Sequence, residues 1–298
     1  MDQQLHIAQL ERWATDGLGG ADRYQRLMSN PLFPRAARTL ARNMLDEAAG
    51  DEAQDGIFKD AGRYVAAMLA VHLHVSGGLT LPRLKQVSEA TGLLSPGRAR
   101  DILGFLLHLE FVEPASPPGL GGAARYVPTE AFMTSWGRHL RAALQAASVI
   151  EPSAELVVAA MRERETMETF ARHHTQGLLQ SVQTLDQSSP YVRVFMHRHA
   201  GNQIVWTLIT TNDDEEFPPT NPIPVSISGL ARRFAVSRTH IARLFDEAEQ
   251  EGLLTWGDGG AVSLEPIARD FMNYAYAGQL SELLKAAAKT ARERPQLA

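Results

Sequence analysis

The sequence lacks cysteine altogether across its 298 residues. This absence excludes disulfide scaffolds, thiolate zinc sites and thiol redox switches. Long apolar runs are missing as well, because no stretch approaches the roughly 18 uninterrupted residues that a membrane-spanning helix needs. The N-terminal residues contain no basic segment followed by an apolar one, so we expect no secretory signal. Together these absences indicate a bacterial-type cytoplasmic protein with no membrane partner.

Catalytic signatures are also missing. The sequence has no phosphate-cradling glycine loop, no nucleophile elbow and no H-E-x-x-H helix. The glycine-rich stretch at 119–122 falls between two expected strands, whereas a nucleotide site needs it between a strand and a helix. Histidines cluster in three close pairs, but no cysteine or spaced acidic residue accompanies them as a metal site requires. We therefore expect no enzyme, no cofactor and no metal. The pairs are His72/His74, His173/His174 and His197/His199.

The chain has only a small excess of negative charge, with a formal net charge of −5. This balance counts against a protein that coats nucleic acid without regard to sequence. It does not exclude a sequence-specific DNA-binding protein, because a local basic patch decides such binding. The chain is long enough for two domains of ordinary size.

A helix-turn-helix pattern is present near the C-terminus, between Ser228 and Trp256. Ser228 is a good N-cap residue, so we expect a short helix to follow it. Ser237 should cap a second helix, which ends before Gly252. The second helix has an apolar stripe at helical spacing, formed by Ile241, Leu244, Phe245 and Ala248.

A β-hairpin is expected after the second helix, with strands at 253–256 and 261–264. In this order of helix, turn, helix and hairpin, the segment resembles the winged helix-turn-helix regulators. Its run LARRFAVSRTHIARLFDEAEQEGLL is similar to their sequence signature. The resemblance implies binding to double-stranded DNA, with the second helix entering the major groove.

The resemblance also implies which side chains contact DNA. Arginine forks bind guanine edges and phosphates, and threonine binds phosphates or base edges. The acidic residues of the second helix stand in its distal half, which should therefore point away from the duplex. The expected contacts are Ser237, Arg238, Thr239, His240 and Arg243 on the second helix, with Arg232 and Arg233 of the preceding helix on phosphates.

The same pattern recurs earlier in the chain. Ala61-Gly62 matches Ala200-Gly201, and Phe132 matches Phe271. The chain therefore looks like two winged-helix units, each with a leading and a trailing helix. In the first unit, the expected DNA contacts are Ser95, Arg98, Arg100 and Arg125.

The two copies differ in ways that bear on DNA binding. Asp101 stands where the second copy has Arg243, and it would repel phosphate. Phe105 replaces Glu247, so that the second helix of the first copy is apolar nearly all round and should be buried on more than one side. Two interpretations stay open. Either both units contact DNA as a single-chain pseudo-dimer, which the remaining arginines favour, or only the second unit does.

We expect a mainly α fold, in which two tandem winged helix-turn-helix units with small β-hairpin wings are joined and braced by long helices. In MarR-like winged-helix regulators, terminal helices of this kind form the dimer interface. By resemblance, helices at 5–15, 135–150, 156–185 and 267–292 should hold the units together, within one chain or between chains. The expected domains are an N-terminal helical arm (1–58), the first unit (59–150), a helical linker (151–189) and the second unit with a C-terminal helix (190–298).

The most basic stretch lies at residues 21–49. It should form a helix that is broken at Asn30-Pro31 and restarts near Pro34. Its arginines, at positions 23, 26, 35, 38 and 42, form either a solvated helix face or an arm that contacts phosphates.

The favoured hypothesis is a sequence-specific, DNA-binding transcriptional regulator of the cytoplasm, associated with the nucleoid. A homodimer is compatible with it, since a pseudo-dimer could still pair with a second copy. The alternative is a winged-helix adaptor that binds another protein without reading DNA. A third hypothesis is a sensor of an unknown small-molecule effector, with a pocket lined by Trp206, Phe195, Trp136 or Phe132.

Overall fold

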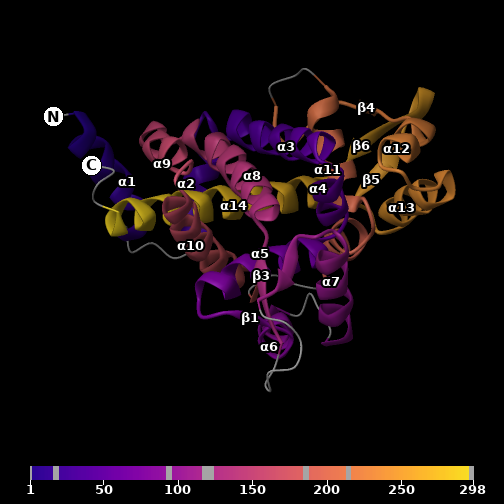
Figure 1. Ribbon diagram of the computed structural model, residues 1–298. Helices are drawn as coiled ribbons and strands as arrows, with labels where there is room; N and C mark the ends of the chain where they lie inside the picture. Colours follow the sequence, from indigo (N-terminus) through magenta and orange to yellow (C-terminus); the bar gives the residue numbers. More distant parts are fainter. Residues whose placement is uncertain are drawn as a thin grey trace. The chain divides into compact units, whose positions relative to one another are not determined.

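The computed structural model describes residues 2–15, 20–91, 96–115, 124–183, 188–212 and 216–294 (Figure 1). The chain is mainly helical with two small antiparallel sheets, as expected. It forms two compact units, each built from segments that are distant in the sequence. Unit 1 comprises Met1–Gly17, Gly62–Leu185 and Ser281–Ala298, and unit 2 comprises Leu18–Ala61 and Asp186–Leu280.

Unit 2 contains the helix-turn-helix segment. In this unit α3 packs on α4 and α11, and α12 packs on α13. Its core contains the buried side chains of Phe33, Phe58 and Phe245. The elements are α2 (Gly20–Met28), α3 (Phe33–Gly50), α4 (Glu52–Phe58), the π-helical turn η2 (Val192–Met196), α11 (Gly201–Thr211), β4 (Ile223–Pro224), α12 (Ile227–Arg233), α13 (Arg238–Gln250), β5 (Leu254–Trp256), η3 (Asp258–Gly260), β6 (Ala261–Leu264) and the first half of α14 (Pro266–Glu293).

Unit 1 contains the earlier copy of the pattern. Its core includes an aromatic group in which the Phe111 and Phe132 rings stack at 4.6 Å and Trp136 lies beside them. The elements are α1 (Asp2–Thr15), α5 (Ala61–Val75), β1 (Leu79–Thr80), α6 (Leu81–Thr91), α7 (Pro96–His108), β2 (Val112–Pro114), β3 (Arg125–Pro128), α8 (Glu130–Ser148), η1 (Pro152–Ala154), α9 (Glu155–Ala160), α10 (Arg164–Gln183) and the last turns of α14.

The two units share one order of elements, which is helix, strand, helix, helix, strand, strand, helix. It runs from α5 to α8 in unit 1 and from α11 to α14 in unit 2. The sheets also correspond, with strand orders β1-β3-β2 and β4-β6-β5. In each sheet the last strand lies in the middle and pairs antiparallel with both neighbours, as in the registers Val112↔Pro128 and Leu254↔Leu264.

Local sequence explains most of the helix-turn-helix. The Ser237 side chain caps α13 by accepting a hydrogen bond from the His240 backbone N–H at 3.1 Å. Gly252 ends the helix with a φ of +69°, a backbone conformation that favours glycine. The expected stripe of Ile241, Leu244, Phe245 and Ala248 is buried. The cap of α12, however, is Ser226 and not Ser228, since the Ser226 side chain accepts from the Gly229 N–H.

Two helical segments differ from expectation in the structure. The helix expected from residue 156 to 185 is interrupted, because α9 ends at Ala160 and α10 begins at Arg164. The N-terminal basic stretch divides as expected between α2 and α3. Its arginines do not share one solvated face, since Arg23 and Arg38 are buried. Arg38 donates hydrogen bonds to the backbone carbonyls of Asn212 and Glu216, so its role is to hold unit 2 together.

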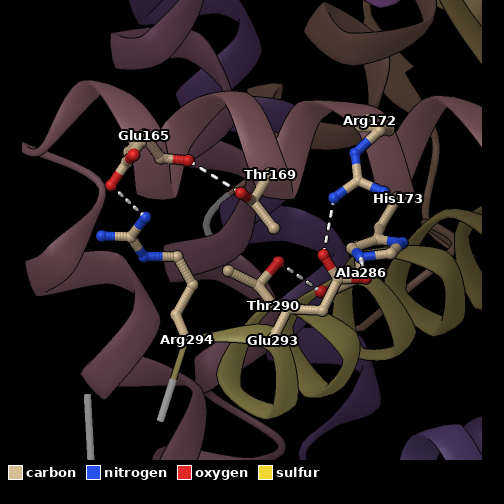
Figure 2. A network of polar contacts seen from close by, with 8 residues as sticks. All are labelled: Glu165, Thr169, Arg172, His173, Ala286, Thr290, Glu293 and Arg294. Atoms are coloured by element: carbon tan, nitrogen blue, oxygen red, sulfur yellow. Dashed lines mark hydrogen bonds and ion pairs between the residues drawn. The ribbon is translucent and has the colours of Figure 1, made fainter. Parts of the chain in front are cut away.

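The C-terminal turns of α14 bind to α10 within unit 1 through a network of polar contacts (Figure 2). The Glu293 carboxylate accepts from Arg172 at 2.6 Å and lies 2.8 Å from His173 Nε2. Arg294 pairs with Glu165 at 2.5 Å. Two arginines and a histidine thereby fix the end of the helix on its neighbour. None of the helices in the described ranges is long and apolar enough to cross a membrane.

Candidate nucleic-acid interface

The N-terminal half of α13 presents most of the predicted contact residues to solvent. Ser237 caps the helix, and the three side chains that follow at positions 238, 239 and 243 belong to its exposed surface. The buried stripe on the opposite side anchors the helix in unit 2, so these side chains are held on a rigid element. The exposed residues of this group are Ser237, Arg238, Thr239 and Arg243.

His240 is placed differently from the other predicted contacts on α13. Its ring is half-buried, and Nε2 lies 2.8 Å from the backbone carbonyl oxygen of His199. Because a carbonyl oxygen can only accept, Nε2 carries the proton and donates. The Nε2–H of His240 is therefore used inside unit 2, where it fastens the first turn of α13 to the segment that precedes α11.

The two arginines at the end of α12 are also exposed. Arg232 and Arg233 occupy its last turn, where positive charge interacts favourably with the helix dipole. The guanidinium carbon of Arg233 lies 5.5 Å from the centre of the Phe234 ring. Four of the predicted arginines thus lie on the exposed surface of one helix pair.

The acidic half of α13 is held by partners that the sequence analysis did not identify. Arg198 forms an ion pair with Glu247, and Arg193 forms one with Glu251 at 2.9 Å. Glu249 accepts a hydrogen bond from the backbone N–H of Trp256 at 3.2 Å. Both arginines belong to the segment 192–200, ahead of α11. The signal for Arg198 in the sequence is the basic run His197-Arg198-His199, whose two histidines alone suggest only a histidine pair.

A hollow of about 600 Å³ lies along α13. Arg198 and Arg243 bring positive charge to its wall, whereas Asp246 and Glu247 bring negative charge. The positive side includes the capped N-terminus of the helix, where backbone N–H groups favour anions. Its other lining residues are Ser237, Thr239, His240, Leu244 and Gln250.

The segment 192–200 has a tightly constrained backbone. It begins with the π-helical turn η2 and ends at Ala200, which has a φ of +62°. The Ala200 N–H donates to the Lys59 carbonyl at 2.7 Å. Gly201 follows at a place where a Cβ would overlap the carbonyl oxygen of Phe195. This backbone brings Arg198 and the His199 carbonyl to α13.

In unit 1, the corresponding arginines lie on α7 and β3. Arg98 and Arg100 are exposed on α7, next to the exposed Asp101. Arg125 is exposed on β3, and its guanidinium donates to the Gly77 carbonyl at 3.2 Å. Ser95, the predicted cap residue, lies outside the described residues.

Helix α7 is less buried than its sequence indicated. Ile102, Leu103 and Leu106 are buried, whereas Gly104 and His108 are exposed. The helix therefore has one buried face and one open face, and the expectation of burial on more than one side is wrong. Phe105, which we expected to be buried by another element, is only half-buried. The Arg63 guanidinium lies over its ring, 4.7 Å from the ring centre.

The aromatic residues of the sensor hypothesis belong to separate cores. Trp136 and Phe132 pack together in unit 1, whereas Trp206 packs edge-on against Phe58 in unit 2 at 5.9 Å. Phe195, also of unit 2, is fully buried. Phe132, Trp136 and Phe195 are thus buried in the cores of their own units, and Trp206 is half-buried.

His139 and His174 are buried in unit 1. The Tyr64 hydroxyl lies 3.0 Å from His139 Nε2, and the His174 ring stacks on Phe170 at 5.8 Å. Burial lowers the pKa of His139 to about 3 and that of His174 to about 4, since the charged forms cannot be solvated. Both rings are therefore neutral at pH 7. Among the described residues, no group of three or more His, Asp or Glu side chains is placed to hold a metal ion.

No protein-family model matches the chain, and neither the curated proteins nor the solved structures give a significant match. The geometry of α12, α13 and the segment 192–200 is therefore the basis for assigning a function.

Proposed function

We propose that the chain is a sequence-specific, double-stranded DNA-binding transcriptional regulator with two winged helix-turn-helix units. The observation that carries this proposal is the exposed group of Arg238, Thr239 and Arg243 on the rigid, capped helix α13. These are the side-chain types that bind base edges and phosphates, and they lie at the end of the helix that enters the major groove in such proteins.

The order of elements supports the winged-helix assignment. In each unit a helix pair is followed by a two-stranded hairpin, and a short strand ahead of the pair completes a three-stranded sheet. In unit 2 the hairpin of β5 and β6 follows α13 directly. The order of elements and the positions of the arginines both support the proposed function.

Charge near α13 is favourable for DNA although the whole chain carries −5. Arg232 and Arg233 add two exposed positive charges on α12. The negative charges of Glu247 and Glu251 are each opposed by an arginine of unit 2. A duplex approaching α13 therefore meets less repulsion than the run of acidic residues suggests.

Unit 1 enters the proposal as the weaker of two DNA-binding units in one pseudo-dimeric chain. The open face of α7 carries Arg98 and Arg100, which are suited to phosphates. Asp101, on the same helix, opposes them in part. The proposal involves no catalytic step, no cofactor and no metal.

Selection from a random library of DNA duplexes, at fixed salt concentration, tests the proposal. We expect one enriched motif and a gel shift with duplexes that contain it. Recovery of unenriched sequence after repeated rounds would contradict sequence-specific binding. Affinity for the selected duplex should exceed that for a scrambled duplex by a factor of at least about 10³.

A protein-binding adaptor is the second candidate. It is favoured by Ile267 and Tyr274, which are large apolar side chains exposed by 56% and 51%. They stand two turns apart on α14 and so lie on one side of the helix. A stable protein partner that is lost on Tyr274→Ser, together with no enriched DNA motif, would decide for this candidate.

A further inference from the structure

We infer that Arg198 is a DNA phosphate contact supplied from outside the helix-turn-helix. The inference rests on the proposed function, because it concerns the same interface. Arg198 lies ahead of α11 in the sequence, yet its side chain lines the hollow along α13 together with Thr239 and Arg243. A duplex that contacts Arg243 therefore has a second arginine within the same concave surface.

The Arg198 guanidinium is available to a phosphate. Its side chain is 50% exposed, and its contact with Glu247 is made through Nη2. A guanidinium has five N–H donors in a planar fork, so one carboxylate contact leaves donors for a phosphate oxygen. Ion pairs that are this exposed contribute little to stability, so a phosphate does not have to displace a strong interaction.

The backbone on both sides of Arg198 is held by contacts within unit 2. The backbone on its C-terminal side is held by the His199–His240 hydrogen bond and by the bond from Ala200 to Lys59. On its N-terminal side lies the π-helical turn η2, and such turns are frequent at functional sites. A backbone that is already ordered loses less conformational entropy on binding, which favours the use of Arg198 as a contact.

Arg193 provides a matched control. It belongs to the same segment and pairs with Glu251, one helical turn beyond Glu247. The exposed fractions of the two arginines are nearly equal, at 48% and 50%. The described residues that line the hollow include Arg198 but not Arg193. The two arginines thus share their type of ion pair and differ in whether they reach the interface.

The test measures how the affinity for the selected duplex depends on salt. Each lost phosphate contact reduces the slope of log K against log [salt] by about 0.9. We expect Arg198→Gln to show this reduction and to bind about fivefold to tenfold more weakly at 0.1 M salt. Arg193→Gln should keep the slope of the wild type, and Arg198→Lys should recover most of it because the charge returns.

Glu247→Gln separates a phosphate contact from a structural role. It breaks the same ion pair but leaves the arginine in place, so the slope and the affinity should not fall. If Glu247→Gln weakens binding as much as Arg198→Gln does, the ion pair itself is responsible and the inference is overturned. A wild-type protein that selects no motif refutes the proposed function. A wild type that binds, with Arg243→Ala weakened and Arg198→Gln unchanged, refutes only the role of Arg198.

Discussion

Gly201 lies against Phe195 so closely that a Cβ at position 201 would overlap the carbonyl oxygen of Phe195. The obstacle is backbone, so it cannot be relieved by turning a side chain. The two residues lie close together just before α11 begins. Because position 201 has no side chain, the backbone of segment 192–200 can take the path that brings Arg198 and the His199 carbonyl to α13.

Gly201→Ala is expected to lower the free energy of unfolding by about 1–3 kcal/mol, the usual cost of forcing extra volume into a packed site. Urea denaturation followed by circular dichroism measures the loss. Gly50→Ala is the control in the same unit, because a Cβ on Gly50 would contact nothing within 4 Å. The Gly50 variant should be as stable as the wild type or slightly more stable, and a Gly201 variant of equal stability would contradict the overlap.

Arg38→Ala tests whether the N-terminal basic stretch is structural. Arg38 is buried and donates to two backbone carbonyls of unit 2, which the alanine variant would leave without these bonds. We expect a loss of about 1–3 kcal/mol in the free energy of unfolding. Arg42→Ala, on the exposed side of α3, should change it by less than about 0.5 kcal/mol. A stable Arg38 variant with weakened DNA binding would instead support a phosphate-contacting arm.

Arg243→Ala should weaken binding to the selected duplex by about 1–3 kcal/mol if the side chain reads a guanine. The preference for that base should relax at the same time, since the specific contact is lost. Gel shifts in competition with duplexes that carry each of the four bases at each position of the selected DNA motif measure both effects. Arg193→Gln removes the same charge from an arginine of unit 2 that does not line the hollow, and its affinity should stay within about twofold of the wild type. Unchanged binding of the Arg243 variant would refute the contact.

The double variant Arg98→Ala/Arg100→Ala tests the pseudo-dimer hypothesis. If both units bind DNA, one wild-type chain should protect two sites about 34 Å apart. The double variant should then lose protection of one site and keep the other in hydroxyl-radical footprinting. A single protected site in the wild type, unaffected by the double substitution, would restrict DNA binding to unit 2.

Unit 1 should lose stability in mild acid because of its buried histidines. In the folded state the pKa of His139 is about 3 and that of His174 about 4, both below the ordinary value of 6.5. Between these values and pH 6.5 the unfolded chain binds more protons than the folded chain. Stability therefore falls as the pH is lowered from about 6.5 towards 4, by about 1 kcal/mol per pH unit for each histidine.

Urea denaturation at a series of pH values from 7.5 to 4.5 checks this dependence. His139→Gln removes one of these two buried histidines, so its stability should depend less steeply on pH. His108→Gln, at an exposed position of the same unit, is the substitution control. A parallel pH dependence for the wild type and His139→Gln would show that burial of His139 does not govern the effect.

Much of α13 could be predicted from the sequence, because its determinants are local. A cap residue acts on a backbone N–H three positions away, and the buried stripe repeats every three or four residues. The hairpin of β5 and β6 is local as well, since its turn residues stand between the two strands. The sequence predicts the N-cap of α12 wrongly, because Ser226 and Ser228 are both suitable residues. In the structure Ser226 has the extended backbone of a cap residue, with φ −110° and ψ 100°.

The sequence by itself thus determined the helix-turn-helix, its exposed arginines and the recurrence of the pattern. Only the tertiary structure decided that Leu18–Ala61 belongs with Asp186–Leu280, that Arg38 is buried, and that Arg198 lines the same hollow as Arg243. These relationships join residues that are distant along the chain. No periodicity encodes such pairs, because they arise only when separate elements bury their apolar faces against each other.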